Sequence, residues 1–277
     1  MKPRPFDYVR PDTVEEAVAL LAEYGDDARI LAGGQSLVPM LNLRIVEAEA
    51  LIDISRIGAL DGILEVGDKK LGDRIEIGAA VTQNKLLAWP QLAEKLPLVA
   101  AALPHVGHFQ TRNKGTVCGS IAHADPSSEL PLALAVLGGE IVLKSQRGER
   151  VLAAKDFQKD MLTTARAPDE LITAVRFPVT NGSGVGFREV ARRHGDFAII
   201  AVAALAENKS AVRLGVGGMA GKPMVRRIAG EDAAHAIAAW ADELEGYEDL
   251  HASAAMRRDL FRNLAPIAVK EAIRCAA

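Results

Sequence analysis

The chain is poor in cysteine, since Cys118 and Cys275 are the only two in 277 residues. Two cysteines in a chain of this length do not form a disulfide framework. They also cannot hold an iron–sulfur cluster, which commonly takes four protein ligands. The sequence therefore excludes a small disulfide-stabilised scaffold and an iron–sulfur cluster bound by this chain alone.

Long hydrophobic runs and an excess of positive charge are also missing. The longest apolar run, residues 197–206, is far shorter than the roughly 20 residues that span a bilayer. A net charge of -3 and a pI near 6.1 provide no general basic field for nucleic acid or anionic membranes. The basic N-terminal residues have no apolar segment behind them, so no secretory signal is predicted. We therefore expect a cytoplasmic protein without a nucleic-acid partner or a membrane span.

The length suits two or three domains, because one hydrophobic core usually serves about 100 to 200 residues. Thr13, with Glu16 three positions later, predicts the start of a helix that ends at Gly25. Periodicity predicts further helices over 84–89, 97–103, 130–137, 233–244 and 256–276, and strands over 28–32, 50–54, 140–144 and 170–177. Residues 64–80 are typical of a hairpin meander, and 185–190, 198–207 and 212–217 of strands or a mixture of strand and helix. We expect domains at 1–55, 56–178 and 179–277.

Two glycine-rich segments each follow an apolar or extended stretch and are typical of backbone sites for phosphate. Glycine lets peptide N–H groups turn toward an anion and approach it closely. A polar run from His123 to Glu129 follows the second segment and supplies the partners that the hydroxyls of a ribityl chain need. Two such segments suit a flavin dinucleotide whose pyrophosphate is held from both sides. They comprise Leu31, Ala32, Gly33, Gly34, Gln35, Ser36 and Leu37, and Thr116, Val117, Cys118, Gly119 and Ser120.

Three other patterns admit different functions. Residues 215–220 fit the G-x-G-x-x-A variant of the Rossmann fingerprint, but Pro223 interrupts the helix that should follow, and the surrounding βαβ unit is missing. His105 and His108 have a generic spacing, and no cysteine or glutamate completes a familiar metal-ligand set with them. Residues 120–125 contain serine, histidine and aspartate without the G-x-S-x-G elbow of a hydrolase. We therefore predict no metal site and no catalytic acid, base or nucleophile.

The two glycine segments resemble those of the FAD-binding medium subunits of molybdenum hydroxylases, a family that includes carbon monoxide dehydrogenase medium chain and the flavin domain of xanthine dehydrogenase. Residues 32–36 match the first pyrophosphate loop of this family, and residues 116–120 match the second. Further matching patterns follow in order at 51–54, 77–82, 123–131, 170–172 and 193–198. The resemblance covers essentially the whole chain.

This resemblance implies an α+β protein with the vanillyl-alcohol-oxidase (PCMH) type FAD-binding fold. Such a fold has two α/β subdomains that clasp FAD, and a C-terminal domain with an antiparallel sheet and a helical bundle. The backbone at 32–36 and 116–120 would hold the pyrophosphate and ribityl chain, with Asp125 and Glu129 as polar partners. Arg188 stands where relatives often carry a lysine near the flavin pyrimidine, and Phe197 where some place a tyrosine against the isoalloxazine face.

Three positions depart from the family pattern. Cys118 replaces a glycine, which makes it either a small space-filling residue or a thiol close to the cofactor. A guanidinium at Arg188 hydrogen-bonds differently from a lysine ammonium. Phe197 lacks a phenol, so gating by a tyrosine hydroxyl is not expected.

The resemblance implies an oxidoreductase flavoprotein subunit whose non-covalent FAD passes electrons to an external acceptor. Molybdopterin would reside in a large partner subunit and two [2Fe–2S] clusters in a small one, with a dimer of heterotrimers as the assembly. One alternative is a free-standing flavin oxidoreductase with its own substrate pocket. Another is an assembly scaffold that has lost FAD, which the intact glycines do not favour.

Overall fold

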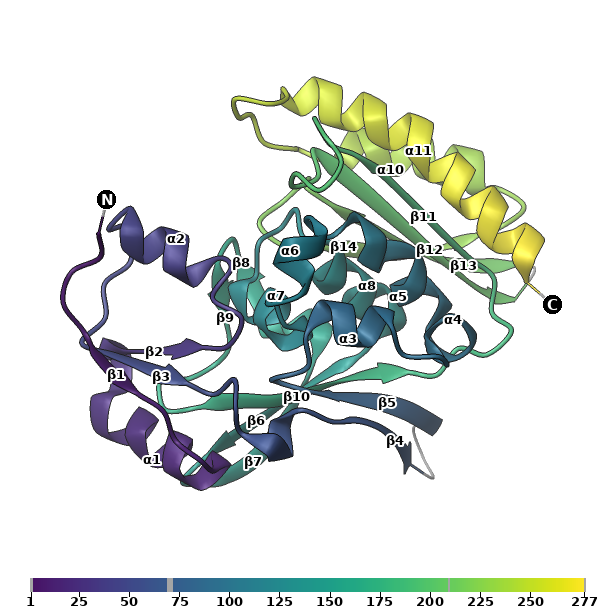
Figure 1. The fold of residues 1–277 in the computed structure, drawn as a ribbon. Helices are drawn as coiled ribbons and strands as arrows, with labels where there is room; N and C mark the ends of the chain where they lie inside the picture. The colour runs from purple at the N-terminus through teal and green to yellow at the C-terminus, as the bar shows by residue number, and fades with distance from the viewer. Residues whose placement is uncertain (1, 69–71, 209, 277) are drawn as a thin grey trace.

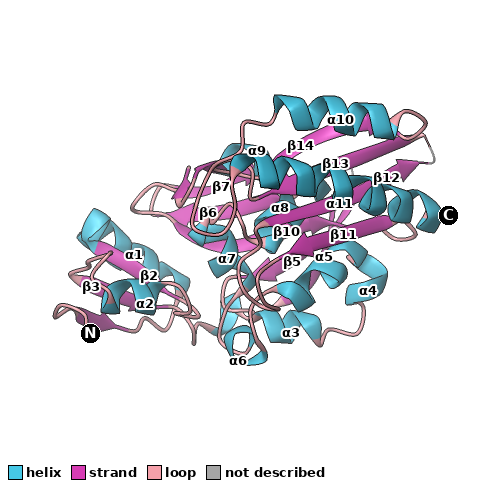
Figure 2. Cartoon of the chain, turned by 90° about the horizontal axis from the view of Figure 1, so that it is seen from above, coloured by secondary structure: helices cyan, strands magenta, loops and turns pink. Residues whose placement is uncertain are grey.

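The computed structural model describes residues 2–68, 72–208 and 210–276, and its strands form three main sheets (Figure 1). The first is a parallel sheet in the order β1-β3-β2, from β1 (Asp7–Val9), β2 (Ala28–Leu31) and β3 (Ala50–Asp53). It stands to one side of the molecule with α1 (Val14–Tyr24) and α2 (Leu37–Asn42), as Figure 2 shows. The 3-10 turn η1 (Gly25–Asp27) leads into β2.

The predicted helix start at Thr13 is confirmed. The Thr13 hydroxyl accepts a hydrogen bond from the Glu16 backbone N–H at 3.1 Å, which satisfies one free donor of the first turn. The Glu16 carboxylate accepts from the Asp12 N–H at 2.8 Å, one residue earlier than in a capping box. Gly25 closes the helix with a φ of 51°, a conformation that glycine adopts without strain.

The second sheet is antiparallel throughout, in the order β4-β5-β10-β6-β7. The resemblance implied an α/β subdomain here, whereas antiparallel pairing with helices packed on the sheet is an α+β arrangement. Of the predicted meander over 64–80, residues 69–71 lie outside the described ranges, and the rest forms one hairpin. The strands are β4 (Ile63–Asp68), β5 (Gly72–Gly78), β6 (Glu140–Ser145), β7 (Gly148–Ala153) and β10 (Leu171–Pro178).

Short helices lie between the second and third sheets (Figure 1). Among them α8 (Glu129–Leu137) is buried along almost its entire length and contacts strands of both sheets. The others on this part of the chain are η2 (Gly58–Leu60), α3 (Gln83–Leu87), α4 (Leu92–Lys95), α5 (Pro97–Ala102), η3 (Leu103–His105), α6 (Phe109–Arg112), α7 (Val117–His123) and α9 (Ala154–Phe157). A two-stranded ribbon of β8 (Gln158–Asp160) and β9 (Thr163–Thr164) follows α9.

The third sheet is the antiparallel meander β11-β12-β13-β14, with α10 and α11 on one face. The resemblance implied a helical bundle at this end, but the structure has a pair of helices. Residues 215–220 run from the end of β13 into a turn, and a strand follows them, so the helix of a Rossmann motif is absent there. The elements are β11 (Val185–Val190), β12 (Ile200–Asn208), β13 (Ala211–Gly217), β14 (Met224–Ala229), α10 (Ala233–Glu243) and α11 (Ala254–Cys275).

Strand β12 joins the two hydrophobic cores of the molecule. Ala201, Ala203 and Leu205 belong to the core beneath the middle helices. The alternating residues Ile200, Val202 and Ala204 belong to the core beneath α10 and α11. Side chains alternate across a strand, so β12 is covered on both faces. No helix of the described residues is long and apolar enough to cross a membrane.

Candidate functional site: two glycine segments and an adjoining cavity

The first glycine segment is the connection from β2 to α2. β2 ends at Leu31, whose carbonyl accepts from the Ile54 N–H at 3.0 Å, and α2 begins at Leu37. Gly34 has a φ of 68°, which most side chains would strain. The Gln35 side chain folds back and donates to the Gly33 carbonyl at 3.1 Å. Ala32, Gly33, Gly34, Gln35 and Ser36 therefore form a tight, partly exposed turn at the carboxyl end of a strand.

Gly33 brings this turn against the second glycine segment. A Cβ built on Gly33 would lie 2.2 Å from the Lys114 carbonyl oxygen and 2.7 Å from the Gly115 Cα. Both distances are far below van der Waals contact, so only glycine permits this approach. The structure thus places the first segment backbone against backbone with the two residues that lead directly into the second.

The second glycine segment differs from the predicted loop, because most of it is the short helix α7. Thr116 is the N-cap, and its hydroxyl accepts from the Gly119 N–H at 2.9 Å. The Val117 N–H donates to the Val81 carbonyl at 3.1 Å, and the Ser120 N–H to the Thr116 carbonyl at 3.2 Å. These three N–H groups are engaged within the protein, and the binding of a ligand by this segment stays a prediction. Gly119 and Ser120 remain partly exposed, while Val117 and Cys118 are buried.

Cys118 lies away from the surface where the two segments meet. Its thiol donates to the Ile77 carbonyl on β5 at 3.4 Å, and the residue is 3% exposed. Burial raises the pKa of the Cys118 thiol far above its usual range. A thiol that stays protonated is a poor nucleophile. Of the two interpretations of Cys118, the structure favours the small space-filling residue.

The far end of α7 adjoins two residues with left-handed backbone conformations. Ala124 has a φ of 55° and Leu162 a φ of 53°, and the Leu162 N–H donates to the Ala124 carbonyl at 3.0 Å. The Gln158 amide donates to the same carbonyl at 2.8 Å. Such conformations cost about 1–2 kcal/mol for a residue other than glycine, and they concentrate at functional sites.

A cavity of about 520 Å³ opens beside Leu162. Asp125 and Ser127 form a polar part of its wall, and the Asp125 carboxylate accepts from the Ser127 N–H at 2.8 Å. Phe197 also lines the cavity and is 59% exposed. Two predicted site residues, Asp125 and Phe197, are therefore brought together at one cavity.

Arg257 of α11 supports the cavity from the C-terminal side. It is 1% exposed and donates to the carbonyls of Ile199 and Gly218 and, at 3.1 Å, to that of Tyr247. Its guanidinium also pairs with Asp249 at 2.7 Å and lies over the Tyr247 ring at 4.1 Å from the ring centroid. Because Ile199 is two residues from Phe197, these bonds fix the end of the segment that carries Phe197. No sequence pattern indicated Arg257, since a lone arginine on a helix is normally solvated.

Arg188 lies on the face of β11 opposite its neighbours Phe187 and Glu189. Its guanidinium pairs with Glu271 of α11 at 2.9 Å, whereas Phe187 and Glu189 face the middle helices, where His105 contacts both. Arg188 therefore points away from the side that its two neighbours face, because neighbouring residues of a strand point to opposite faces, and its role beside the flavin stays a prediction. Glu189, the next residue on the strand, was not among the predicted site residues.

Two glutamates of this part of the chain have buried carboxyl groups. Glu129, the first residue of α8, is 5% exposed, and the Glu189 side chain is 4% exposed. Burial, with a smaller contribution from Asp125, raises the pKa of Glu129 to about 7. Burial and the neighbouring Glu129 charge raise the pKa of Glu189 to about 8. Glu129 was predicted as a polar partner of the cofactor, and its carboxyl is buried four residues along the chain from Asp125.

Comparison with known proteins finds relatives that cover nearly the whole chain. Residues 4–180 match the family described as "FAD binding domain in molybdopterin dehydrogenase". The chain is 36% identical over 281 residues to nicotine 6-hydroxylase medium subunit from Paenarthrobacter nicotinovorans, with 96% of each protein covered. It is 43% identical over 200 residues to the 6-hydroxypseudooxynicotine dehydrogenase complex subunit alpha of that organism, an alignment that spans 72% of this chain and 66% of the relative.

Solved structures extend the similarity to the complete fold. The structure of carbon monoxide dehydrogenase from Hydrogenophaga pseudoflava superposes with a TM-score of 0.89 at 32% identity, with both chains fully covered. That of quinoline 2-oxidoreductase from Pseudomonas putida 86 gives a TM-score of 0.90 at 31% identity, covering 100% of this chain and 99% of the other. The predicted α+β FAD-binding fold is confirmed. The chain belongs to the FAD-binding medium subunits of the molybdenum hydroxylase family.

Proposed function

We propose that this chain binds FAD non-covalently, accepts electrons from the [2Fe–2S] clusters of a small partner subunit and delivers them to an external acceptor. The contact of Gly33 with Lys114 and Gly115 carries the proposal. It brings together the two glycine-rich segments that carry the family pattern, and helix α7 leads from this place to the cavity. A molybdopterin-binding large subunit would oxidise the substrate, and a cytoplasmic dimer of heterotrimers would be the assembly.

The residues present fit FAD. Where the segments meet, Gly33 and Gly115 leave no side chain between the two backbones, so a pyrophosphate can approach the peptide groups. Helix α7 leads from this point to Ala124, and its seven residues span about 10 Å. At its far end the cavity offers the Phe197 ring as an apolar wall and Asp125 and Ser127 as polar partners. We place the pyrophosphate at the meeting point of the segments and the isoalloxazine ring in the cavity.

The bound flavin would supply the redox chemistry, and the chain would supply position and electrostatics. The Gly33–Gly34 turn and the exposed atoms of Gly119 and Ser120 would hold the dinucleotide. Phe197 would cover one face of the ring and exclude water from it. Arg257 would keep Phe197 in place through the Ile199 carbonyl.

The first test is the visible absorption spectrum of the purified chain, followed by chromatography of the material that denaturation releases. Flavin bands with intact FAD in the released fraction support a non-covalent flavoprotein. A colourless chain that takes up no added FAD contradicts the proposal and favours an assembly scaffold.

The free-standing oxidoreductase makes a different prediction. A chain with its own substrate site would have its flavin reduced by a small organic substrate without partner subunits. We expect the flavin of the isolated chain to be reduced by dithionite, and by substrate only when the molybdenum and iron–sulfur subunits are added. Native mass measurement of that mixture tests the dimer of heterotrimers.

A further inference from the structure

Lys114 lies where the first glycine segment meets the residues that lead into the second. A Cβ built on Gly33 would lie 2.2 Å from the Lys114 carbonyl oxygen. With standard bond lengths, the Cα atoms of the two residues are therefore no more than about 6 Å apart. Lys114 is exposed, and it is the only charged residue within 31–37 and 114–120. A single cation thus accompanies two segments that are otherwise uncharged.

The backbone from which the Lys114 side chain starts is held in place. The Thr111 carbonyl accepts from the Lys114 N–H at 3.1 Å and from the Gly115 N–H at 2.7 Å. The Gly115 carbonyl accepts from the Gln83 N–H at 2.8 Å. The Gln83 side chain is 5% exposed and lies against Gly115, because a Cβ there would be 3.0 Å from its Oε1. A ligand that binds Lys114 therefore has to order only the side chain, and not the backbone, which limits the entropic cost of binding.

The Lys114 ammonium has no partner within the part of the chain that the structure describes. Lys85, Lys95 and Lys144 each pair with a carboxylate, whereas Lys114 forms no ion pair and no side-chain hydrogen bond there. The neighbouring cation, Arg112, is engaged, since its guanidinium donates to backbone carbonyls at 2.8 and 2.9 Å. Lys114 is therefore available to a ligand, and Arg112 is not.

The first glycine segment offers hydrogen-bond donors without a full charge. Among the residues described, the backbone N–H groups of 33–36 donate to no acceptor of the protein. Successive free N–H groups of this kind attract an anion, but each carries only a partial charge. The pyrophosphate of a dinucleotide carries two negative charges at neutral pH. The four-carbon stem of a lysine reaches about 6 Å, which is enough to bring the Lys114 ammonium to an anion on these N–H groups.

We propose that the ammonium of Lys114 binds the pyrophosphate of FAD where the two glycine segments meet. The inference rests on the proposed function and names the residue that supplies positive charge at that site. The N–H groups of 33–36 orient the pyrophosphate, and Lys114 neutralises part of its charge. A lysine binds phosphate as a point charge, so an arginine at the same position retains most of the effect.

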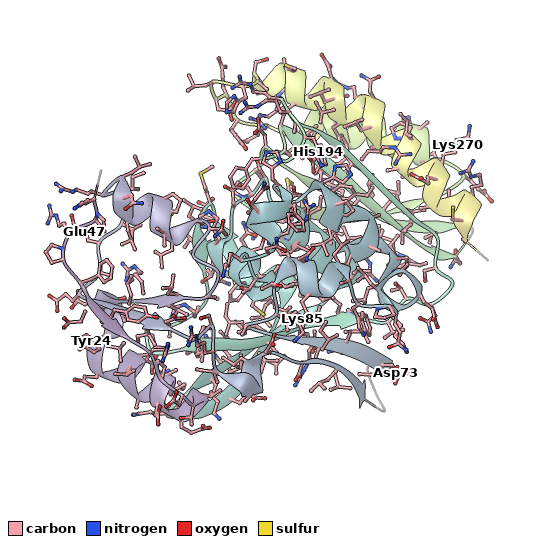
Figure 3. The ribbon with its side chains drawn as sticks, viewed as in Figure 1. Tyr24, Glu47, Asp73, Lys85, His194 and Lys270 are labelled. Carbon is pink, nitrogen blue, oxygen red and sulfur yellow. The ribbon has the colours of Figure 1, made fainter. Side chains whose placement is uncertain are left out.

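The first experiment maps lysine acetylation of the purified chain with and without bound FAD, by mass spectrometry of its peptides. We expect Lys114 to react readily in the deflavinated chain and to be protected by FAD. Lys270 is the internal control, because it is an exposed lysine on α11, far from the glycine segments in the views of Figure 1 and Figure 3. Its acetylation should be the same in both samples. Acetylation of Lys114 that FAD does not change overturns the proposal.

The second experiment measures the dissociation constant of FAD in Lys114→Gln, Lys114→Arg and the matched control Lys270→Gln. At low salt we expect a rise of about 10-fold in Lys114→Gln, the lower end for a hydrogen bond to a charged group. Lys114→Arg should bind within about threefold of the wild type, and Lys270→Gln should be unchanged. Between about 0.01 M and 1 M salt the Debye length falls from about 30 Å to about 3 Å, so the difference should shrink to about twofold. Equal affinity of Lys114→Gln and wild type at low salt overturns the proposal, and so does a loss that salt leaves unchanged.

A third measurement separates a direct role at the phosphates from a structural one. The phosphorus-31 resonances of bound FAD should shift in Lys114→Gln, while the flavin absorption bands and the thermal unfolding of the apo form stay as in the wild type and in Lys270→Gln. Unchanged phosphorus resonances contradict contact with the pyrophosphate. A wild-type chain that takes up no FAD refutes the proposed function, whereas a chain that binds FAD and leaves Lys114 reactive refutes this inference alone.

Discussion

Replacing Gly33 with alanine tests whether the two glycine segments form one site. The new Cβ would lie 2.2 Å from the Lys114 carbonyl oxygen, whereas ordinary van der Waals contact begins at 3.4 Å, so the two backbones must separate by about 1 Å. Relaxation of this kind costs about 1–3 kcal/mol. If 2 kcal/mol of it is lost from FAD binding, the dissociation constant rises about 30-fold.

The assay is a fluorescence titration of the deflavinated chain with FAD, paired with thermal unfolding of the apo form. Gly58→Ala is the control, since a Cβ at Gly58 meets nothing within 4 Å and its φ is not positive. Gly34→Ala should still weaken binding less than Gly33→Ala. Its Cβ would meet the flexible side chains of Leu31 and Val38 at 3.2 Å and no backbone, although the φ of 68° adds about 1–2 kcal/mol of strain. A Gly33→Ala chain that binds FAD within twofold of the wild type would refute the reasoning that the contact forms the site.

Three further outcomes are expected. The folded chain holds protons on Glu129 and Glu189 that the unfolded chain releases near pH 4.5, because burial raises both pKa values. The free energy of unfolding, measured in urea, should therefore fall between pH 5 and pH 8, and it should fall less steeply in Glu189→Gln. A free energy of unfolding that rises with pH in that window contradicts the raised pKa values. Arg257→Met should lower the free energy of unfolding by about 3–5 kcal/mol, because Asp249 and buried carbonyls lose their partner, and an unchanged urea midpoint would count against this role. An aromatic disulfide reagent should modify one thiol in the native chain, the exposed Cys275, and two after unfolding; rapid modification of two in the native chain would show that Cys118 is accessible.

Local signals in the sequence predict much of the fold. The Thr13 cap and Gly25 stop define α1, and the apolar runs at 130–137 and 140–144 become α8 and β6. The sequence analysis placed a loop at 116–120 because glycines dominated the interpretation. Thr116 as a capping residue, with Val117 and Ile121 four residues apart, is a helix signal that was available. The glycines favoured a loop and the capping threonine favoured a helix, and the structure has the helix.

The site residues held by backbone conformation were predictable from the sequence. The residues whose position depends on which face of a strand they occupy were harder to predict. Gly33, Asp125 and Phe197 were identified from the sequence and lie where the segments meet or at the cavity. Arg188 was predicted from the family pattern alone, and on a strand a difference of one residue moves a side chain to the other face. The register of β11 against β12 decides this, and register is a tertiary property that short strands do not encode locally.

The double burial of β12 has a mechanical consequence. A strand whose inward side chains belong to the core beneath the middle helices cannot swing away without breaking that core. Relative domain motion is the default only where the interface is small and polar. The C-terminal sheet is therefore no hinged cover for the cavity, and the exposed turn at His194 and Phe197 must admit or exclude a visiting molecule by movements of a few side chains.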